Sequence, residues 1–241
     1  MPAVHADYTP QGTTQHYGGM ECYVTGPADA SKAILGVYDI FGPWASTYLG
    51  ADLLAAHTAM RVVLPDFFRG DPLAPETLPA DTPAKQERFR TFLLSLGEFT
   101  HIASELLDVA AALQQQGVTT LGVYGLCWGS KPCGIACGDG TPFQALVQIH
   151  PSFIDPDDAL KLRVPMALFP SRDDETPKLD AYVDRVLHNP AIGKASIVHH
   201  YPQHHGFAGA RAQLGDAANR AAFQDVYERA ANFFVQHMQR P

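Results

Sequence analysis

A cysteine between two glycines is the feature of the sequence that could most directly do chemistry. The stretch GVYGLCWGSKP spans residues 122–132 and includes an apolar run, so Cys127 would stand on the turn between a strand and a helix. In a G-x-C-x-G pattern the glycines let backbones approach the turn, and the thiol is exposed for attack on a carbonyl carbon. The alternative is an inert buried thiol, because free cysteines are among the most buried residues.

Two further groups that such a nucleophile needs follow later in the chain. Asp173 comes after MALFPSR and His205 after SIVHHYPQH, so nucleophile, acid and histidine occur in the order found in a hydrolase sheet. We expect Asp173 to orient His205, and His205 to take the proton of Cys127. Alternatively, Asp173, Asp174 and Glu175 form only a solvated acidic turn.

Other clusters of reactive side chains favour structural roles. The run HHYPQHH (199–205) contains four histidines, but neighbours in a strand point to opposite faces, so they do not converge on a metal. Cys133 and Cys137 lie four apart on a predicted helix, where small residues usually permit close packing. We expect neither a metal nor a cofactor.

Alternating strands and helices must position these groups. Short apolar runs typical of strands occupy residues 33–38, 61–68, 119–125, 143–151, 164–171 and 194–202. Helical spacing is found in 46–59, 101–117, 128–138, 178–189 and 216–238. This alternation predicts one α/β domain over residues 1–241, with a mostly parallel sheet and helices on both faces. Residues 70–100 would form a Pro-rich excursion and a helix near the site.

Composition limits the classes of partner. The chain has 241 residues, 46% of them hydrophobic, and a formal net charge of -8, which disfavours nucleic acid and anionic membranes. We expect a small-molecule substrate and leave the oligomeric state open between monomer and homodimer. No signal-peptide pattern or long apolar run is present, so we expect a cytosolic protein whose four cysteines are free thiols.

Six motifs together give the chain a specific resemblance. They are DIFGPW (39–44), LPDFFRGDP (64–72), GVYGLCWGSKP (122–132), HPSF (150–153), SRDDETP (171–177) and HHGFAG (204–209). The chain resembles the dienelactone hydrolase family of α/β-hydrolases, especially its eukaryotic, fungal-type branch. The resemblance implies an α/β-hydrolase fold and a carboxymethylenebutenolidase-like hydrolase of ester or lactone bonds.

The resemblance also assigns roles to individual residues. The family's nucleophile falls on Cys127 and its histidine on His205. The family's acid precedes a proline as D-x-x-x-P, and Pro177 lies four residues after Asp173, which selects Asp173 over Asp174. The chain would thus use a Cys-His-Asp triad and form a thioester intermediate.

An acidic residue and two backbone groups would complete this site. Asp39 occupies the position just before IFG where the family has a carboxylate that contacts the resting thiol, although Asp39 could also be only a turn former. The backbone N–H groups of Ile40 and Trp128 would hold the oxyanion formed when Cys127 attacks the carbonyl.

Bacterial members of the family bind a carboxylate of their substrate with arginines, and the sequence has no clear match for those arginines. The family places an arginine four residues after the histidine, where this chain has Gly209, and the nearest arginine is Arg211. A second family motif, R-x-x-x-Y, is matched weakly by Arg88 and Phe92. An apolar substrate is therefore an alternative to a charged lactone.

Two other functions use the same residues. The site could isomerise or cyclise a lactone or polyketide-like compound without adding water. Alternatively, the fold could serve as a binding module that has lost catalysis, since a fold does not determine a function.

Overall fold

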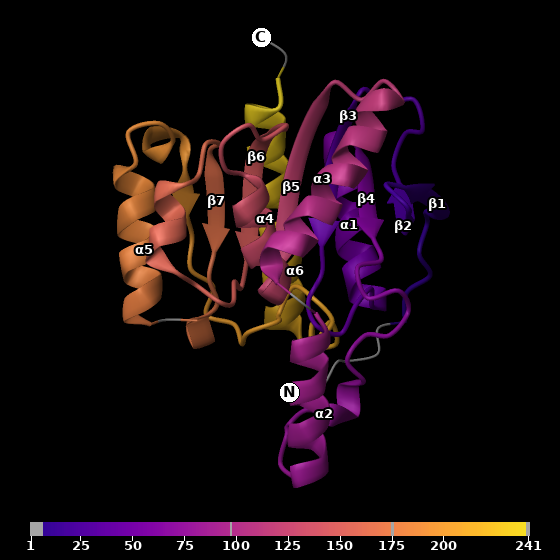
Figure 1. Cartoon of the computed structure of the whole chain (residues 1–241), viewed down its shortest axis with the longest axis vertical. Helices are drawn as coiled ribbons and strands as arrows, with labels where there is room; N and C mark the ends of the chain where they lie inside the picture. Colours follow the sequence, from indigo (N-terminus) through magenta and orange to yellow (C-terminus); the bar gives the residue numbers. More distant parts are fainter. Residues whose placement is uncertain (1–6, 97, 175, 240–241) are drawn as a thin grey trace.

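A central sheet organises the chain in the computed structural model, which describes residues 7–96, 98–174 and 176–239. Its strands follow the order β1-β2-β4-β3-β5-β6-β7-β8 (Figure 1). From β4 through β3 to β8 all neighbours are parallel. The strands are β1 (Thr13–Tyr17), β2 (Met20–Thr25), β3 (Lys32–Val37), β4 (Arg61–Pro65), β5 (Thr120–Leu126), β6 (Phe143–Ile149), β7 (Met166–Phe169) and β8 (Ile197–Val198).

Helices cover both faces of this sheet, as the sequence predicted. α1 and α6 pack on one face, and α3, α4 and α5 on the other (Figure 1). The helices are α1 (Ala45–Thr58), α2 (Pro83–Ser95), α3 (Phe99–Gln115), α4 (Ser130–Ala136), α5 (Pro177–His188) and α6 (Ala217–His237). None of the helices in the described ranges combines the length and the apolar character needed to cross a membrane. The predicted mostly parallel α/β architecture is confirmed.

The central strands are apolar on both sides because both faces are covered. In β3, Ala33, Leu35 and Val37 belong to the core beneath α3 and α4, whereas Ile34 points to the core beneath α1 and α6. This two-residue alternation fixes the register of each strand. It also fixes which residue stands at each strand's carboxyl end, where the site is formed.

Two regions differ from the predicted pattern. The antiparallel hairpin of β1 and β2 was not predicted, because the TTQHY sequence of β1 is polar and four of its five residues are exposed. The predicted strand 194–202 shortens to Ile197–Val198, followed by one isolated bridge between Ser171 and Tyr201. The chain after this bridge is therefore free to turn toward the site at His205.

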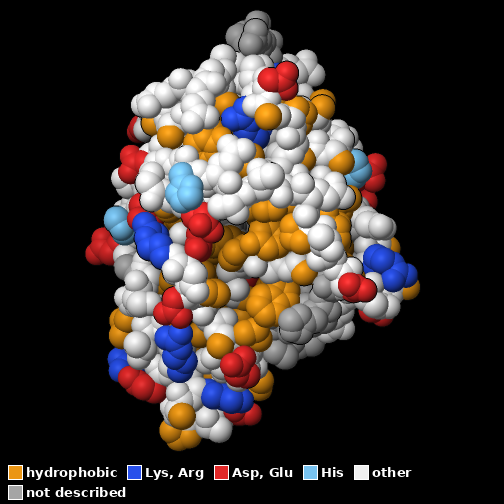
Figure 2. Space-filling model, turned by 90° about the vertical axis from the view of Figure 1, so that its right-hand side faces the viewer, with side chains coloured by type: hydrophobic (Ala, Val, Ile, Leu, Met, Phe, Trp, Pro, Cys, Tyr) orange, Lys and Arg blue, Asp and Glu red, His pale blue; other side chains and the backbone are white. Residues whose placement is uncertain are grey.

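The excursion after β4 carries α2 beyond the carboxyl ends of the strands. A 3-10 turn, η1 (Pro75–Thr77), precedes α2, which projects from the lower end of the molecule (Figure 1). Pro83 stands in the first turn of α2, and the Thr82 hydroxyl accepts a hydrogen bond from the Lys85 N–H. Charged side chains of both signs cover this lower end, while hydrophobic side chains gather in the middle of the face seen from the β1 side (Figure 2).

Candidate active site

Cys127 stands on a sharp turn between β5 and the helices that follow it. Its φ of 51° lies in the left-handed region, and a 3-10 turn, η2 (Cys127–Gly129), leads directly into α4. Gly129 explains part of the G-x-C-x-G pattern, because a Cβ there would stand 2.2 Å from the carbonyl oxygen of Val37. The turn therefore packs against the end of β3 and holds the half-buried thiol at the carboxyl edge of the sheet.

The loop after β6 supports this turn from the other side. The N–H of Ser152 donates to the carbonyl oxygen of Cys127 at 3.1 Å. Two residues earlier, His150 has a φ of 38°, which turns the chain toward the cysteine. The Ser152 hydroxyl lies 3.4 Å from Cys127 Sγ and 3.5 Å from His205 Nε2. Ser152 thus contacts both groups that the sequence paired as nucleophile and base.

The acid beside His205 is Asp174, which corrects the choice of Asp173. Asp174 Oδ1 lies 2.5 Å from His205 Nδ1, and Asp174 Oδ2 accepts the Ser171 N–H at 2.7 Å. The Asp174 side chain is only 5% exposed. Asp173 is 48% exposed and accepts the backbone N–H of His205 at 2.9 Å, so it holds the main chain and not the imidazole.

The one-residue error follows from the local backbone. Residues Arg172–Asp174 form a 3-10 turn, in which successive side chains point about 120° apart. The spacing to Pro177 therefore does not determine which of two neighbouring aspartates faces the histidine. Glu175, the third residue of the predicted acidic turn, lies outside the described residues.

His205 has the electrostatic surroundings of a group that carries a proton. Burial disfavours its charge, but the Cys127 sulfur and the Asp174 carboxylate outweigh burial and raise the pKa of His205 to about 10. Its neighbour His150 is fully buried at a ring-centroid distance of 5.1 Å. Burial and the nearby His205 hold the pKa of His150 well below its usual value, which keeps that ring neutral.

Asp39 is buried in the site, but its hydrogen bonds differ from those expected. Oδ1 accepts the Phe41 N–H at 3.0 Å and Oδ2 accepts the Ala210 N–H at 2.9 Å. Burial raises the pKa of Asp39, while these two N–H groups oppose that rise. The hydrogen-bond partners that the structure gives the Cys127 sulfur are Ser152 and His205, whereas Asp39 was expected to contact the thiol.

A cavity of about 170 Å³ opens beside the thiol. Cys127 and His205 line it together with Ile40 and Arg211. Leu78, from the excursion after β4, and Phe41 add apolar surface, and Asp39 adds a carboxylate. The predicted oxyanion residue Ile40 and the substrate-binding candidate Arg211 are thus brought to the nucleophile.

Arg88 and Phe92, the other predicted substrate-binding residues, lie apart from this cavity. Phe92 is 2% exposed, packs against Phe68 at 5.4 Å and lines a different cavity of about 300 Å³ with Phe67 and His101. Arg88 lies 3.4 Å from Asp71 in a solvent-exposed ion pair. In this structure Phe92 packs α2 against the core, and Arg88 lies on the exposed surface of that helix.

The remaining cysteines and Trp128 have structural surroundings. Trp128 is 1% exposed, and its ring packs against Phe68 at 5.1 Å, so its side chain anchors the turn after the nucleophile. Cys133 and Cys137 are fully buried, and burial raises the pKa of each thiol. Burial therefore makes these two thiols unreactive, unlike the half-buried thiol of Cys127.

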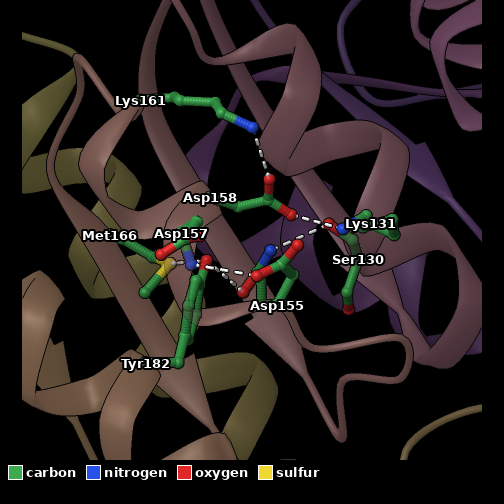
Figure 3. A network of polar contacts seen from close by, with 9 residues as sticks. Ser130, Lys131, Asp155, Asp157, Asp158, Lys161, Met166 and Tyr182 are labelled. Carbon is green, nitrogen blue, oxygen red and sulfur yellow. Dashed lines mark hydrogen bonds and ion pairs between the residues drawn. The ribbon is translucent and has the colours of Figure 1, made fainter.

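A polar network holds α4, the helix that follows the turn with the nucleophile. Lys131, on α4, forms an ion pair with Asp158 of the 3-10 helix η3 (Pro156–Leu160), and Lys161 lies 3.1 Å from the same carboxylate (Figure 3). Buried Gln148 donates to the carbonyl oxygen of Ser130 at 2.8 Å and accepts from the Tyr182 hydroxyl at 3.2 Å. These contacts tie α4 to β6 and α5, which restrains the turn at Cys127.

Three histidines of the 199–205 run have separate partners. His199 packs on Tyr201, His204 Nε2 lies 3.1 Å from the Arg211 carbonyl oxygen, and His205 faces Asp174. Within the described ranges, no three His, Cys, Asp or Glu side chains gather closely enough to hold a metal ion.

Sequence reasoning missed two residues that contact the predicted machinery. Ser152 and His150 both belong to the HPSF motif, which was used for the resemblance but given no role. Their position in the sequence could have predicted this. The motif directly follows β6, and the carboxyl ends of parallel strands meet at one edge of the sheet.

Comparisons with known proteins place the chain among the dienelactone hydrolases. A sequence model of the dienelactone hydrolase family matches residues 20–238. An uncharacterized AIM2 family protein of Schizosaccharomyces pombe is 31% identical over 96% of this chain and 94% of its own. A carboxymethylenebutenolidase homolog of Rattus norvegicus is 29% identical over 71% of this chain and 68% of its own.

Solved structures show the same fold at low identity. A putative dienelactone hydrolase from Klebsiella pneumoniae superposes with a TM-score of 0.70 at 18% identity, covering 90% of this chain and 93% of that one. A dienelactone hydrolase-like promiscuous phosphotriesterase from metagenomic libraries gives 0.67 at 16% identity, with coverage of 95% and 99%. The predicted α/β-hydrolase fold is confirmed, and the fungal relative supports the predicted branch. From the fold and the match over residues 20–238, the chain belongs to the dienelactone hydrolase family.

Proposed function

We propose that the protein is a cysteine-dependent hydrolase of an ester or lactone bond. The observation that carries this proposal is the series of contacts from Asp174 through His205 to Ser152 and Cys127, beside a cavity. A nucleophile, a base and a group that orients the base are the parts that acyl transfer requires. Membership of a hydrolase family supports the same reaction class.

The proposed reaction has two acyl-transfer steps. Asp174 orients His205 and stabilises its charged form, while the Cys127 thiolate attacks the carbonyl carbon. The backbone N–H groups of Ile40 and Trp128 hold the oxyanion, and the alcohol leaves with a proton from His205. Water, deprotonated by His205, then cleaves the thioester and restores the thiol.

The cavity suggests a small acyl group. Its volume of about 170 Å³ and its apolar residues Ile40, Phe41 and Leu78 suit a short apolar or unsaturated chain. Arg211 adds a cation beside the nucleophile, which would pair with a carboxylate on the substrate. We therefore propose small esters or lactones, including anionic ones, as the substrate class. The net charge of -8 supports the absence of nucleic-acid and anionic-membrane partners, and a cytosolic location remains part of this proposal.

The direct test measures turnover of small aryl esters and unsaturated lactones by the native protein and by Cys127→Ala. We expect Cys127→Ala to lose at least about 10³-fold in kcat, because covalent catalysis needs the sulfur. A matched control is Cys137→Ala, which removes a buried thiol of the same size away from the cavity. Full turnover by Cys127→Ala would overturn the proposal.

The mass of the product separates hydrolysis from the alternative reaction. A hydrolase adds one water to a lactone, whereas an isomerase or cyclase using the same thiol leaves the mass unchanged. Mass spectrometry of the lactone products therefore decides between them. Binding without turnover of any ester or lactone in the set would instead favour a binding module.

A further inference from the structure

The cavity beside Cys127 is large enough for only part of a substrate. Its volume of about 170 Å³ lies below the roughly 300–1,000 Å³ typical of small-molecule sites. Its walls come from the residues after β3, the excursion after β4 and the chain around His205. The loop between β6 and η3, all of which the structure describes, contributes no residue to them. When the acyl part of an ester fills this cavity, the alcohol part therefore lies on another surface beside the sulfur.

The loop between β6 and η3 carries an exposed aromatic side chain. The Ser152 hydroxyl lies 3.4 Å from Cys127 Sγ, and the Ser152 N–H donates to the Cys127 carbonyl oxygen at 3.1 Å. The following residue, Phe153, is 48% exposed. Within the described chain, it is the phenylalanine or tryptophan that is left exposed to solvent. A single exposed apolar side chain is common on protein surfaces, so exposure alone does not assign a function.

The backbone of Phe153 adds an observation of a different kind. Its φ of 58° is in the left-handed region, which a bulky residue adopts only at a cost in energy. The described non-glycine residues that share this conformation are Ala59, Arg69, Cys127, His150 and Phe153. The last three follow β5 and β6, at the edge of the sheet where the site is formed. Strained backbone clusters at functional sites, so the conformation of Phe153 indicates a role in this site.

A row of aromatic rings supports Phe153 from the core. The Phe153 ring packs on Phe99 at a centroid distance of 5.1 Å, and the Phe99 ring lies 6.2 Å from that of Trp128, the buried residue after the nucleophile. An ion pair between Lys131 and Asp158 holds η3, at the end of the loop, to α4 (Figure 3). These contacts fix the position of the Phe153 ring, although the residue stays exposed to solvent.

Phe99 connects this aromatic surface to a larger space. Together with Ile135 of α4, Phe99 lines a cavity of about 550 Å³. Each lysine or arginine that lines this cavity has an aspartate partner: Lys131 and Lys161 pair with Asp158, and Arg163 pairs with Asp139. The cavity therefore offers aromatic and aliphatic surface rather than a free cation, which suits an uncharged aromatic group.

We propose that Phe153 is a specificity-determining residue that packs against an aromatic alcohol part of the ester. The acyl part occupies the cavity beside Cys127, and the phenol- or naphthol-type group lies on Phe153 and Phe99. Offset or edge-to-face packing of the rings stabilises this arrangement. The substrate class is then aryl esters of small acids, ahead of lactones, whose acyl and alcohol parts share one small ring. This inference rests on the proposed use of Cys127 as nucleophile.

The test compares two esters that share an acetyl group, 2-naphthyl acetate and ethyl acetate. We expect Phe153→Ala to lower the ratio of their kcat/KM values, naphthyl over ethyl, by about tenfold, because it removes the ring that packs on the naphthyl group. Phe153→Tyr, which keeps a ring, should hold this ratio within about twofold of the native value. The ratio cancels any loss that affects both esters equally, such as a shift of the nucleophile.

Val235→Ala is a matched control, because Val235 is an exposed apolar residue on α6, which covers the opposite face of the sheet from α3 and α4. This variant should keep the native ratio. An unchanged ratio in a folded Phe153→Ala would overturn the proposal, and so would equal falls in Phe153→Ala and Phe153→Tyr. Should Phe153→Ala fail to fold by circular dichroism, Phe153→Gly takes its place, because glycine adopts the left-handed conformation readily.

A binding measurement separates this proposal from the proposed hydrolysis. N-(2-naphthyl)acetamide is the amide counterpart of the naphthyl ester, and naphthalene fluorescence follows its binding to Cys127→Ala without turnover. Adding Phe153→Ala to that variant should raise the dissociation constant of the amide by about tenfold. An unchanged dissociation constant would overturn the packing of substrate on Phe153, whereas full turnover of esters by Cys127→Ala would overturn the role of the thiol.

Discussion

The loops after β5, β6 and β7 and the segment that carries α2 lie at the same end of the sheet, but they are held in different ways. In the loops, side chains and backbone groups are joined across elements, as Ser152 is to Cys127 and Asp174 to His205. In α2, Phe92 is the one residue that is buried, and the described ion pairs are exposed. The difference separates a preorganised site for chemistry from a helix that packs on the core through one buried ring and the partly buried Phe89 and Leu93.

The largest expected effect in this comparison comes from the acid beside the base. Asp174→Asn should lower kcat by on the order of 10²- to 10⁴-fold, because the amide no longer stabilises charged His205 and can hold the wrong ring tautomer. Steady-state kinetics with an aryl ester measure this loss.

Asp173→Asn is the matched control for this change. Its remaining carbonyl oxygen can still accept the His205 N–H, so kcat should fall by less than about threefold. If Asp173→Asn were the more damaging of the two, the assignment of Asp174 as the orienting acid would be wrong.

The one buried ring of α2 gives the next effect, on stability. Phe92→Ala should lower the free energy of unfolding by about 3 kcal/mol, because it removes a buried ring packed on Phe68. Leu94→Ala, at a position 68% exposed on the same helix, should cost less than about 0.5 kcal/mol. Urea unfolding measures both, and equal costs would contradict the view that Phe92 anchors α2.

The sequence predicted the regions that depend on periodic patterns and strand ends. Cys127 and His205 line the same cavity, as expected from their order after predicted strands, because the ends of parallel strands meet at one edge of the sheet. Asp174 was missed because neighbouring residues on a 3-10 turn face different directions, which spacing alone does not resolve. Ser152 was missed because the hydroxyl gains its role only from contacts between distant segments.

Arg211 tests whether the cavity recognises an anion. Arg211→Met keeps much of the side-chain length but removes the charge, so kcat/KM for carboxylate-bearing esters should fall by about 10- to 100-fold. Neutral aryl esters should change by less than about threefold, since they do not need the guanidinium. Equal losses for both substrates would indicate that Arg211 only shapes the cavity.

The proton on His205 should make stability depend on pH. Burial opposes its charge, but Cys127 and Asp174 raise the folded-state pKa to about 10, above the usual value near 6.5. The charged form therefore adds stability that is fully present below about pH 6.5 and is lost as the pH rises through about 10.

Comparison with Cys127→Ala isolates this dependence, because the variant lacks the sulfur that helps to raise the pKa of His205. Between pH 6.5 and pH 10, the native protein should lose on the order of 1 kcal/mol more free energy of unfolding than the variant. Urea titrations at several pH values measure the two curves. Parallel curves would show that the sulfur does not raise the pKa of His205.

Substitution of Arg88 on α2 should give the smallest effect, and it tests whether α2 takes no part in binding substrate. Its ion pair with Asp71 is exposed at 3.4 Å, so Arg88→Ala should cost less than about 0.5 kcal/mol in stability. Its side chain does not line the cavity beside Cys127, so KM for anionic and neutral esters should change by less than about twofold. Arg90→Ala, which removes a more exposed arginine paired within α2, is the control. A tenfold rise in KM for anionic esters with Arg88→Ala alone would mean that α2 moves onto the bound substrate, and the division between a fixed site and a peripheral helix would then fail.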